Sequence, residues 1–219
     1  MNSNCFSFVC HVRHENSSQA PCEFLNLLHV PAGYSVDKKV LQGNFSMAQG
    51  YNFAMRNSTA KYKIYLSEYL EIVNRNFLKD ILSLFENHPE LGMLGVLGAK
   101  KLPLNGNWRE STERYGKLLL AGKSVNYLEV RGVDYEPVQV IDGMIMVTQY
   151  DLTWREDLFK DHFFYDSAQC LEFYKAGYAV GIPKQHEAWC FYHNNTDTLV
   201  EFYQERELFC REYQAFINQ

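Results

Sequence analysis

The residue best placed for chemistry is Asp166, within the segment that runs from Trp154 to His193. The pattern predicts that Asp166 begins a helix and that Gly177 ends it. An oxygen at a helix start accepts bonds from free backbone N–H groups, and glycine suits the left-handed position after the last turn. Gln169 stands where the partner of a capping box is expected. A carboxylate held in this way among aromatic rings suits a catalytic base, although helix capping alone also explains the aspartate.

Three further carboxylates lie beside predicted strands. Asp142 precedes Gly143 within the apolar run VQVIDGMIMV, and this step either contacts a substrate or forms a bulge or bend. Glu68 and Glu71 follow the strand predicted over residues 61–66. Regular alternation sends them to opposite faces, so one of them is a candidate for binding a cation at the strand end. Solvated loop carboxylates are the alternative.

Basic side chains cluster where the first predicted strand ends, and there His11 and His14 flank Arg13. A basic group there can bind phosphate, and a hydrogen-bonded surface cluster is the alternative. His193 lacks the second ligand pair that supports a zinc site. We therefore expect His193 to be structural or to face a diphosphate.

The composition limits the class of protein. The 219 residues suffice for one α/β domain with a full core. The net charge of −5 disfavours a general nucleic-acid binder. No apolar run is long enough to span a bilayer, and the N-terminal residues carry no export signal. We expect a cytoplasmic protein whose six cysteines are reduced core thiols.

The apolar patterns alternate between strands and helices, which favours an α/β layered domain with a largely parallel sheet. Residues 100–124, rich in turn residues, are predicted to be a mobile excursion. An apolar stripe over residues 199–216 indicates a helix packed on the domain, with a dimer interface as the alternative. The expected strands are residues 6–12, 34–41, 61–66, 91–97, 138–147 and 178–182. The other expected helices are residues 22–28, 77–85 and one that begins at Ser46.

Several phrases, in this order, resemble a known family: FSMAQGYNFAM, KYKIYL, NRNFLKDIL, VIDGMIMVTQYD, WREDLF and FYDSAQCLEFYKAGY. The chain resembles family 2-type glycosyltransferases, closest to the glycosyltransferase-like domain named for streptomycin-biosynthesis proteins. The resemblance implies the GT-A fold, a mixed and mostly parallel central sheet flanked by helices. It also implies a single domain over residues 1–219, with a nucleotide-binding half (about 1–98), an acceptor half (about 125–195) and a C-terminal helix (about 197–217).

The resemblance implies transfer of a sugar from a nucleotide-diphospho-sugar to an unidentified hydroxyl acceptor. In that reaction Asp166 is the general base and Asp142 orients the acceptor. The aromatic ring of Trp154 is a candidate for stacking on a sugar. The residues assigned to donor or acceptor binding are Arg13, His14, Glu15, Ser46, Met47, Asn52, Gly143, Trp154 and Arg155.

The resemblance also implies a divalent cation, Mn²⁺ or Mg²⁺, which neutralises the diphosphate leaving group. Glu68 or Glu71, with His193, are the expected ligands. Tyr69 stands where a metal-binding aspartate is expected, and a phenol is a poor ligand for these ions. This substitution supports an alternative, a degenerate GT-A protein that binds sugars, nucleotides or proteins without catalysis. The expected partners are the donor and the acceptor, with no nucleic acid; a homodimer is an option.

Overall fold

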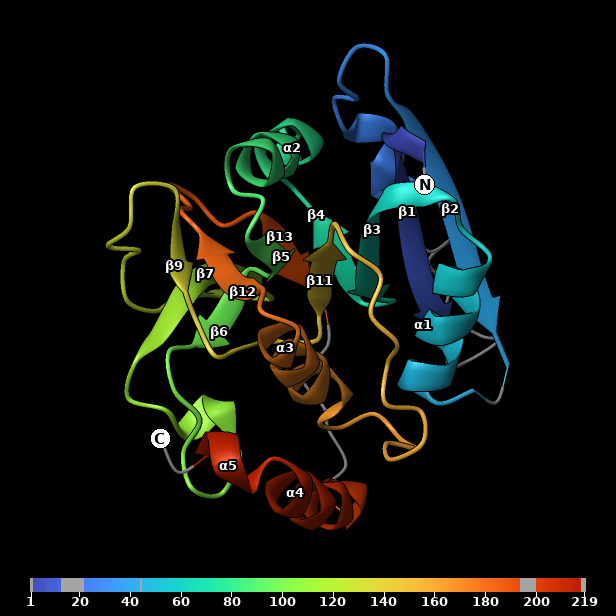
Figure 1. The fold of residues 1–219 in the computed structure, drawn as a ribbon. Coiled ribbons are helices and arrows are strands. Elements are labelled where there is room, and N and C mark those ends of the chain that lie inside the picture. Colours follow the sequence, from blue (N-terminus) through green and yellow to red (C-terminus); the bar gives the residue numbers. More distant parts are fainter. Residues whose placement is uncertain (1, 13–21, 44, 194–199, 218–219) are drawn as a thin grey trace.

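The computed structural model describes residues 2–12, 22–43, 45–193 and 200–217. In these residues the main feature is a seven-stranded sheet in the order β2-β1-β3-β11-β5-β12-β9 (Figure 1). Its strands are β1 (Asn2–Val12), β2 (Ser35–Gln42), β3 (Ala60–Ser67), β5 (Leu91–Leu94), β9 (Tyr135–Pro137), β11 (Ile145–Thr148) and β12 (Ala179–Pro183).

The strand directions confirm a mixed, mostly parallel sheet. β1 pairs in parallel with β2 and β3, and β5 pairs in parallel with β12. β11 lies antiparallel between β3 and β5, and β9 lies antiparallel to β12. Five of the seven described strands therefore run the same way, and their carboxyl ends meet along one edge.

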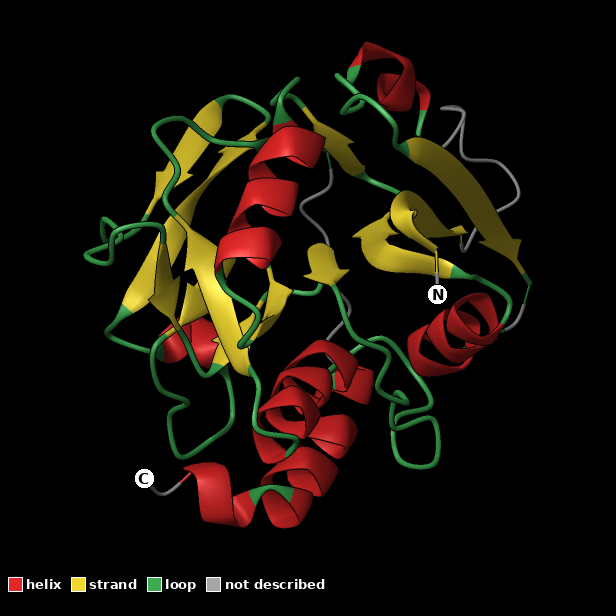
Figure 2. Cartoon of the chain, turned by 45° about the horizontal axis from the view of Figure 1, so that its top comes forward, coloured by secondary structure: helices red, strands yellow, loops and turns green. Residues whose placement is uncertain are grey.

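Helices flank this sheet (Figure 2). The helix predicted to begin at Ser46 is confirmed together with its capping box, because Gln49 N donates to Ser46 Oγ at 3.2 Å and Ser46 N donates to Gln49 Oε1 at 3.1 Å. The α-helices are α1 (Met47–Arg56), α2 (Phe77–Asn87), α3 (Tyr165–Lys175), α4 (Val200–Glu212) and α5 (Gln214–Ile217). The 3₁₀ turns are η1 (Glu23–Leu27) and η2 (Trp108–Glu110).

Residues 100–124, predicted to be a mobile excursion, contribute strands to a second, mainly antiparallel sheet. The prediction of a mobile excursion was therefore wrong. Among the described residues the order is β10-β6-β7-β13-β4, and β8 pairs with β7. Gly116, one of the turn residues of this range, has φ +105°, and a Cβ there would meet Val96 O at 1.9 Å. The glycine is required at this position because the neighbouring strand approaches closely, and it does not mark a mobile segment. The strands are β4 (Leu70–Ile72), β6 (Leu97–Ala99), β7 (Arg114–Leu120), β8 (Lys123–Asn126), β10 (Val140–Ile141) and β13 (Cys190–Tyr192).

Two runs predicted as single strands divide between the two sheets. Residues 91–97 form β5 in the large sheet and begin β6 in the small one. Residues 138–147 likewise contribute β10 and β11, with Asp142 and Gly143 between them. The predicted interruption at Asp142-Gly143 is therefore a crossing from one sheet to the other.

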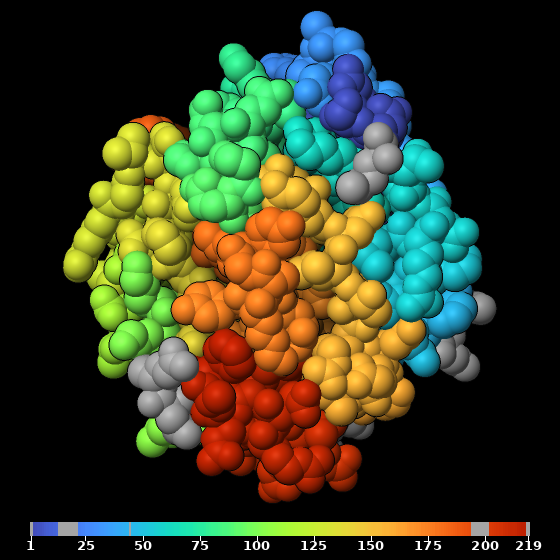
Figure 3. Space-filling model, viewed as in Figure 1, coloured from blue at the N-terminus to red at the C-terminus, as the bar shows by residue number. Residues whose placement is uncertain are grey.

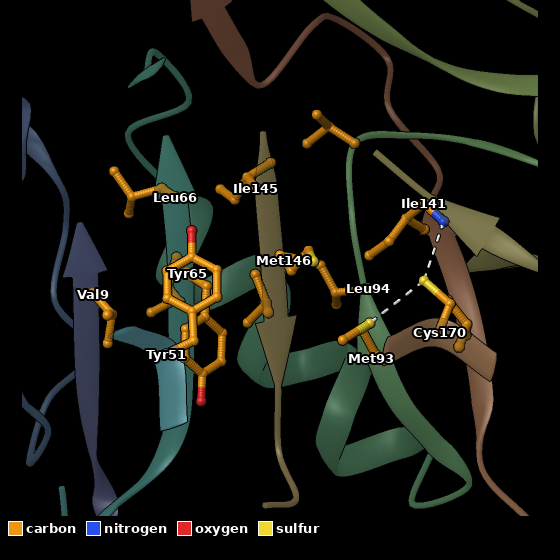
Figure 4. Close-up of a cluster of buried hydrophobic side chains, with 14 of the residues drawn as sticks. Val9, Tyr51, Tyr65, Leu66, Met93, Leu94, Ile141, Ile145, Met146 and Cys170 are labelled. Atoms are coloured by element: carbon orange, nitrogen blue, oxygen red, sulfur yellow. Dashed lines mark hydrogen bonds between the residues drawn. The ribbon is translucent and has the colours of Figure 1, made fainter. Parts of the chain in front are cut away.

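The buried core joins the large sheet to α1, α2 and α3. Figure 4 shows Val9, Tyr65 and Met146 on neighbouring strands, facing the same region. Cys170 of α3 joins this core, because its Sγ accepts from Ile141 N at 3.4 Å and lies 3.8 Å from Met93 Sδ. All six cysteines are free thiols, and four of them are buried.

The C-terminal helices pack on the domain beside α3, and in Figure 3 they form one continuous surface with it. Phe209 and Tyr213 are fully buried, and the Tyr213 hydroxyl donates to Glu172 Oε1 of α3 at 2.8 Å. The packed-helix interpretation of the stripe is thus confirmed for its described members; residue 199 lies outside them. Among the described residues, none of the helices combines the length and the hydrophobicity that a transmembrane span needs.

A candidate active-site cleft

A cleft of about 780 Å³ opens where β1, β3 and β10 end. Ligands of open α/β sheets bind at such carboxyl ends. Its other walls come from α1, η2, the segment before α3, and α4. The predicted site residues that line the cleft are Ser46, Met47, Glu68, Asp142, Gly143 and Asp166.

A larger groove of about 1090 Å³ lies elsewhere, between the N-terminal side of α2 and the β7–β8 hairpin. Its lining includes Arg75, Lys117 and Trp189. None of the predicted site residues among the described ones line this groove. The smaller cleft is therefore the one that fits the chemistry.

Asp166 holds its carboxylate against the Asp142-Gly143 crossing. Gly143 N donates to Asp166 Oδ2 at 2.9 Å, and Ser167 N donates to Oδ1 at 2.7 Å. The side chain is partly exposed to the cleft. Two backbone donors thus fix both oxygens, and each oxygen keeps a lone pair for another partner.

The expected cap geometry around Asp166 was wrong. The helix begins at Tyr165, after Phe164 in the left-handed region at φ 57°, so Asp166 lies inside the first turn. Gln169 forms no capping box; its Nε2 donates to Leu152 O at 2.8 Å. The left-handed Phe164 is an unusual start for a helix, which the sequence pattern does not signal. Gly177, at φ +85°, takes the predicted left-handed position after the helix.

The pKa of Asp166 is raised to about 6, first because burial penalises the charged carboxylate and second because the Asp142 carboxylate is near. Bonds from Ser167 N and Gly143 N and the charge of Arg109 act in the opposite direction. The pKa of the Asp166 carboxyl is therefore in the range in which a side chain can accept and release a proton near neutral pH.

Asp142 is buried and paired with Arg109. Arg109 Nη2 donates to Asp142 Oδ2 at 3.0 Å, and Met144 N donates to Asp142 Oδ1 at 2.9 Å. The side chain of Asp142 is 5% exposed, whereas that of Arg109 is 52% exposed. Each oxygen of this buried carboxylate therefore has a hydrogen-bond donor, as buried polar groups require.

Gly143 sits where no side chain fits. A Cβ there would lie 2.5 Å from the Tyr165 hydroxyl and 3.0 Å from Asp166 Oδ2. Tyr165 OH also donates to Gly143 O at 3.2 Å. The close approach of this backbone to α3 is what brings the Gly143 N–H to the Asp166 carboxylate.

Only one of the three predicted metal ligands lines the cleft. Glu68 does so, next to Tyr69. Glu71 and His193 do not; Glu71 Oε2 lies 3.4 Å from His193 Nε2, with both side chains at least one third exposed. No cluster of three or more metal-ligating side chains occurs among the described residues. The expected set of Glu68, Glu71 and His193 is therefore not assembled, because Glu71 on β4 and His193, which follows β13, do not line the cleft.

Three residues assigned to substrate binding have structural roles instead. Asn52 Nδ2 donates to Trp154 O and Trp154 N donates to Asn52 Oδ1, each at 2.9 Å and fully buried. The Trp154 ring packs on Tyr51 at a 5.0 Å centroid distance. Arg155 binds the carboxylates of Asp157, Glu172 and Glu212. None of the three lines the cleft. Arg13, His14 and Glu15 lie outside the described residues.

Two polar groups that shape the cleft were not predicted. Arg109 comes from the segment expected to be an excursion. Glu205 of α4 is buried, and its Oε1 accepts from Lys160 N and Asp161 N at 3.0 Å each. Its Oε2 accepts from Phe163 N at 3.0 Å. One carboxylate thus holds three backbone donors of the wall before α3, and nothing in the local sequence indicated this long-range contact.

Aromatic rings line much of the cleft. Tyr69 and Tyr192 meet edge to face at a centroid distance of 6.3 Å, and Phe163 and Phe202 do so at 5.4 Å. All four residues line the cleft. The aromatic surroundings expected for Asp166 are therefore present, although the ring of Trp154 is not among them.

The fold is shared with known glycosyltransferases. The structure of S. aureus TarS 1-349 in complex with UDP matches with a TM-score of 0.60 and 13% identity, over 94% of this chain and 64% of that one. GalNAc-T7 with UDP, GalNAc and Mn²⁺ matches with a TM-score of 0.59 and 8% identity, over 99% of this chain and 58% of that one.

A third match is the mannosyltransferase PcManGT from Pyrobaculum calidifontis in complex with GDP-Man and Mn²⁺. Its TM-score is 0.53 at 10% identity, over 88% of this chain and 57% of that one. The chain thus spans about two thirds or less of the solved proteins that it matches. At these identities the similarity establishes the GT-A fold.

No curated protein sequence matches the chain. The model of a family described as glycosyltransferase-like matches residues 7–213, almost the entire length. That span includes both sheets, the paired carboxylates of the cleft and the helix that carries Asp166. On this evidence the chain belongs to the glycosyltransferase-like family.

Proposed function

We propose that the chain transfers a sugar from a nucleotide-diphospho-sugar to a hydroxyl acceptor, with Asp166 as the general base. The observation that carries this proposal is the position of Asp166, which is fixed by two backbone donors and partly open to the cleft. Its pKa of about 6 suits a base near neutral pH.

In the proposed reaction the acceptor oxygen attacks the anomeric carbon of the donor. The acceptor proton passes to a free lone pair of the Asp166 carboxylate, and the nucleoside diphosphate leaves with the electrons of the broken bond. Asp142, buried beside Arg109, is proposed to orient the acceptor. Proton removal by a positioned carboxylate contributes about 10²–10⁴-fold to such a reaction.

We propose that the diphosphate of the donor binds at the end of the cleft that Ser46 and Met47 line, at the start of α1. The N–H groups of a helix start favour a nearby anion. The matched TarS structures hold UDP or UDP-GlcNAc, and PcManGT holds GDP-Man, which supports a nucleotide-diphospho-sugar as the donor class. Arg13, His14 and Glu15 are assigned to the donor on the family resemblance.

Two of the matched transferases hold Mn²⁺, and we propose that Glu68 is the ligand from this chain to a divalent cation. Such ions accept one or two protein carboxylates and take further oxygens from phosphates. The cation would supply charge neutralisation at the diphosphate. Within the family, we propose kinship with the domain named for streptomycin-biosynthesis proteins, on the phrases quoted above.

Calorimetric titration with UDP-, GDP- and dTDP-sugars in the presence of Mn²⁺ tests donor binding. Donor hydrolysis, with water as the acceptor, then tests turnover. Asp166→Asn should keep donor binding and lose most turnover, whereas Asp37→Asn, an exposed carboxyl on β2, should keep both. Failure of all three donors to bind would end the transferase proposal.

The second candidate is a GT-A protein that binds without catalysis. Tyr69 beside Glu68, where a second carboxylate would be expected, favours it. This candidate predicts donor binding that is independent of Mn²⁺, without hydrolysis, and unchanged by Asp166→Asn. The same titrations therefore separate the two proposals.

A further inference from the structure

The turn that carries Arg109 is built rigidly into the rim of the cleft. Gly106, at φ +73°, packs so closely on α4 that a Cβ would lie 3.0 Å from the Phe209 ring. Asn107 Oδ1 accepts from Arg109 N at 3.2 Å, and Arg114 Nη1 donates to Arg109 O at 2.7 Å. The backbone of Arg109 is thus held from both sides.

The side chain of Arg109 is held as well. Its guanidinium carbon lies 5.2 Å from the centre of the Trp108 ring, and that ring is buried. Its Nη2 reaches Asp142 Oδ2 at 3.0 Å. A guanidinium that is stacked on one side and bonded to a buried carboxylate on the other has a defined orientation.

A continuous chain of contacts joins Arg109 to Asp166. Arg109 binds one oxygen of Asp142, and the other oxygen accepts from Met144 N at 2.9 Å. These bonds close the backbone around Gly143, whose N–H donates to Asp166 Oδ2 at 2.9 Å. The orientation of the Gly143 N–H therefore depends on Asp142, and Asp142 depends on Arg109.

We propose that Arg109 is a positioning residue for the general base, acting through Asp142 and the Gly143 N–H on the carboxylate of Asp166. The catalytic part of this inference rests on the proposed function. The positional part does not, because the contacts exist without any substrate.

Arg109 also changes the charge around Asp166. The negative charge of Asp142 raises the pKa of Asp166, and the positive charge of Arg109 lowers it. Removal of the guanidinium takes away the positive charge that lowers the pKa of Asp166, so Asp166 should take up its proton at a higher pH. The other titratable or charged side chains that line the cleft with Asp166 are His11, Glu68, Tyr69, Lys160, Asp161, His162, Tyr165 and Tyr192. Cys170 of α3 interacts electrostatically with Asp166 as well.

The test compares Arg109→Gln and Arg109→Lys with Arg56→Gln, which removes the same charge from an exposed pair on α1. One readout is the pH profile of kcat/KM for hydrolysis of UDP-GlcNAc with Mn²⁺. The other is the titration of the Asp166 carboxyl by ¹³C NMR, assigned by its loss in Asp166→Asn. The NMR readout needs no substrate.

In Arg109→Gln the acid limb of the profile and the NMR midpoint should both move upward by roughly 0.5–1 pH unit. The value of kcat should fall more than KM rises, because the base and not donor binding is disturbed. Arg109→Lys should restore part of the shift, and Arg56→Gln should match the wild type.

An unmoved Asp166 midpoint in folded Arg109→Gln, equal to that in Arg56→Gln, would overturn the inference. If Arg109→Gln does not fold, the NMR midpoint of Asp166 in Arg109→Lys is the deciding measurement. The lysine ammonium lies at a different position from the arginine guanidinium, so it should still shift that midpoint. Absence of hydrolysis of all three donor types, UDP-, GDP- and dTDP-sugars, by the wild type, with an NMR midpoint that moves as expected, would refute the proposed function and leave the role of Arg109 standing.

Discussion

Asp166 should reduce the stability of the fold in a pH-dependent way, and Asp166→Asn measures this. The folded environment raises the pKa of the carboxyl from 3.8 to about 6, so the folded protein binds the proton more tightly than the unfolded chain does. For a carboxyl shifted upward, ionisation disfavours folding. The penalty is complete above the folded pKa and disappears as the pH falls towards the unfolded value.

The size of the effect follows from the shift. A difference of about two pKa units corresponds to about 3 kcal/mol near pH 8, of which about 1.5 kcal/mol remains near pH 5. The side chain is partly exposed to water in the cleft, which reduces the effect. We therefore expect the stability of Asp166→Asn relative to the wild type to be greater near pH 8 than near pH 5 by about 0.7–1.4 kcal/mol.

Urea unfolding of both proteins at the two pH values gives the stability of Asp166→Asn relative to the wild type at each pH, and hence its change with pH. The constant effect of replacing a carboxylate oxygen by an amide cancels, because it is present at both pH values. Asp37→Asn, at an exposed carboxyl, should show a smaller change. A relative stability of Asp166→Asn that is equal at both pH values, or lower near pH 8, would refute the proposed environment of Asp166.

Three other changes test the site and the packing around it. Asn52→Ala should lower the free energy of unfolding by about 2–4 kcal/mol in urea, because it leaves two buried backbone groups unpaired, whereas Asn57→Ala, at an exposed helix end, should cost less than about 0.5 kcal/mol. Gly143→Ala should destabilise the fold by about 1–3 kcal/mol through overpacking and displace Asp166, which donor hydrolysis would show as a loss of turnover with the donor affinity retained. Glu68→Gln should raise the Mn²⁺ concentration needed for half-maximal donor binding in calorimetry, and an unchanged requirement would contradict its proposed role as a ligand.

The parts of the fold that the sequence predicted are those set by local interactions. The capping box of Ser46 and Gln49 lies within one turn of helix, and the apolar run over residues 77–85 is a single helical face. The first three parallel strands follow from apolar runs bounded by turns. Each of these patterns involves neighbours within a few positions, where propensity and periodicity act.

The parts that were missed depend on contacts between distant segments. Arg109 and Asp142 meet because β6 pairs with both β7 and β10, which no local pattern encodes. Phe164 adopts left-handed backbone to begin α3, contrary to its residue type. Asn52 and Trp154, 102 positions apart, resembled binding residues because a polar side chain and an aromatic ring serve either purpose. For such residues burial, rather than residue type, distinguishes structure from function.

The contact between Glu205 and the backbone of residues 160–163 has a practical consequence for how much of the chain is needed. The amides that it accepts belong to the wall in front of Asp166. A truncation that removes α4 would therefore strip three backbone amides of their shared acceptor and expose Phe164 and Phe159 to water. Helix α4 therefore supports the wall of the cleft that faces Asp166, and shortened versions of the protein should retain it.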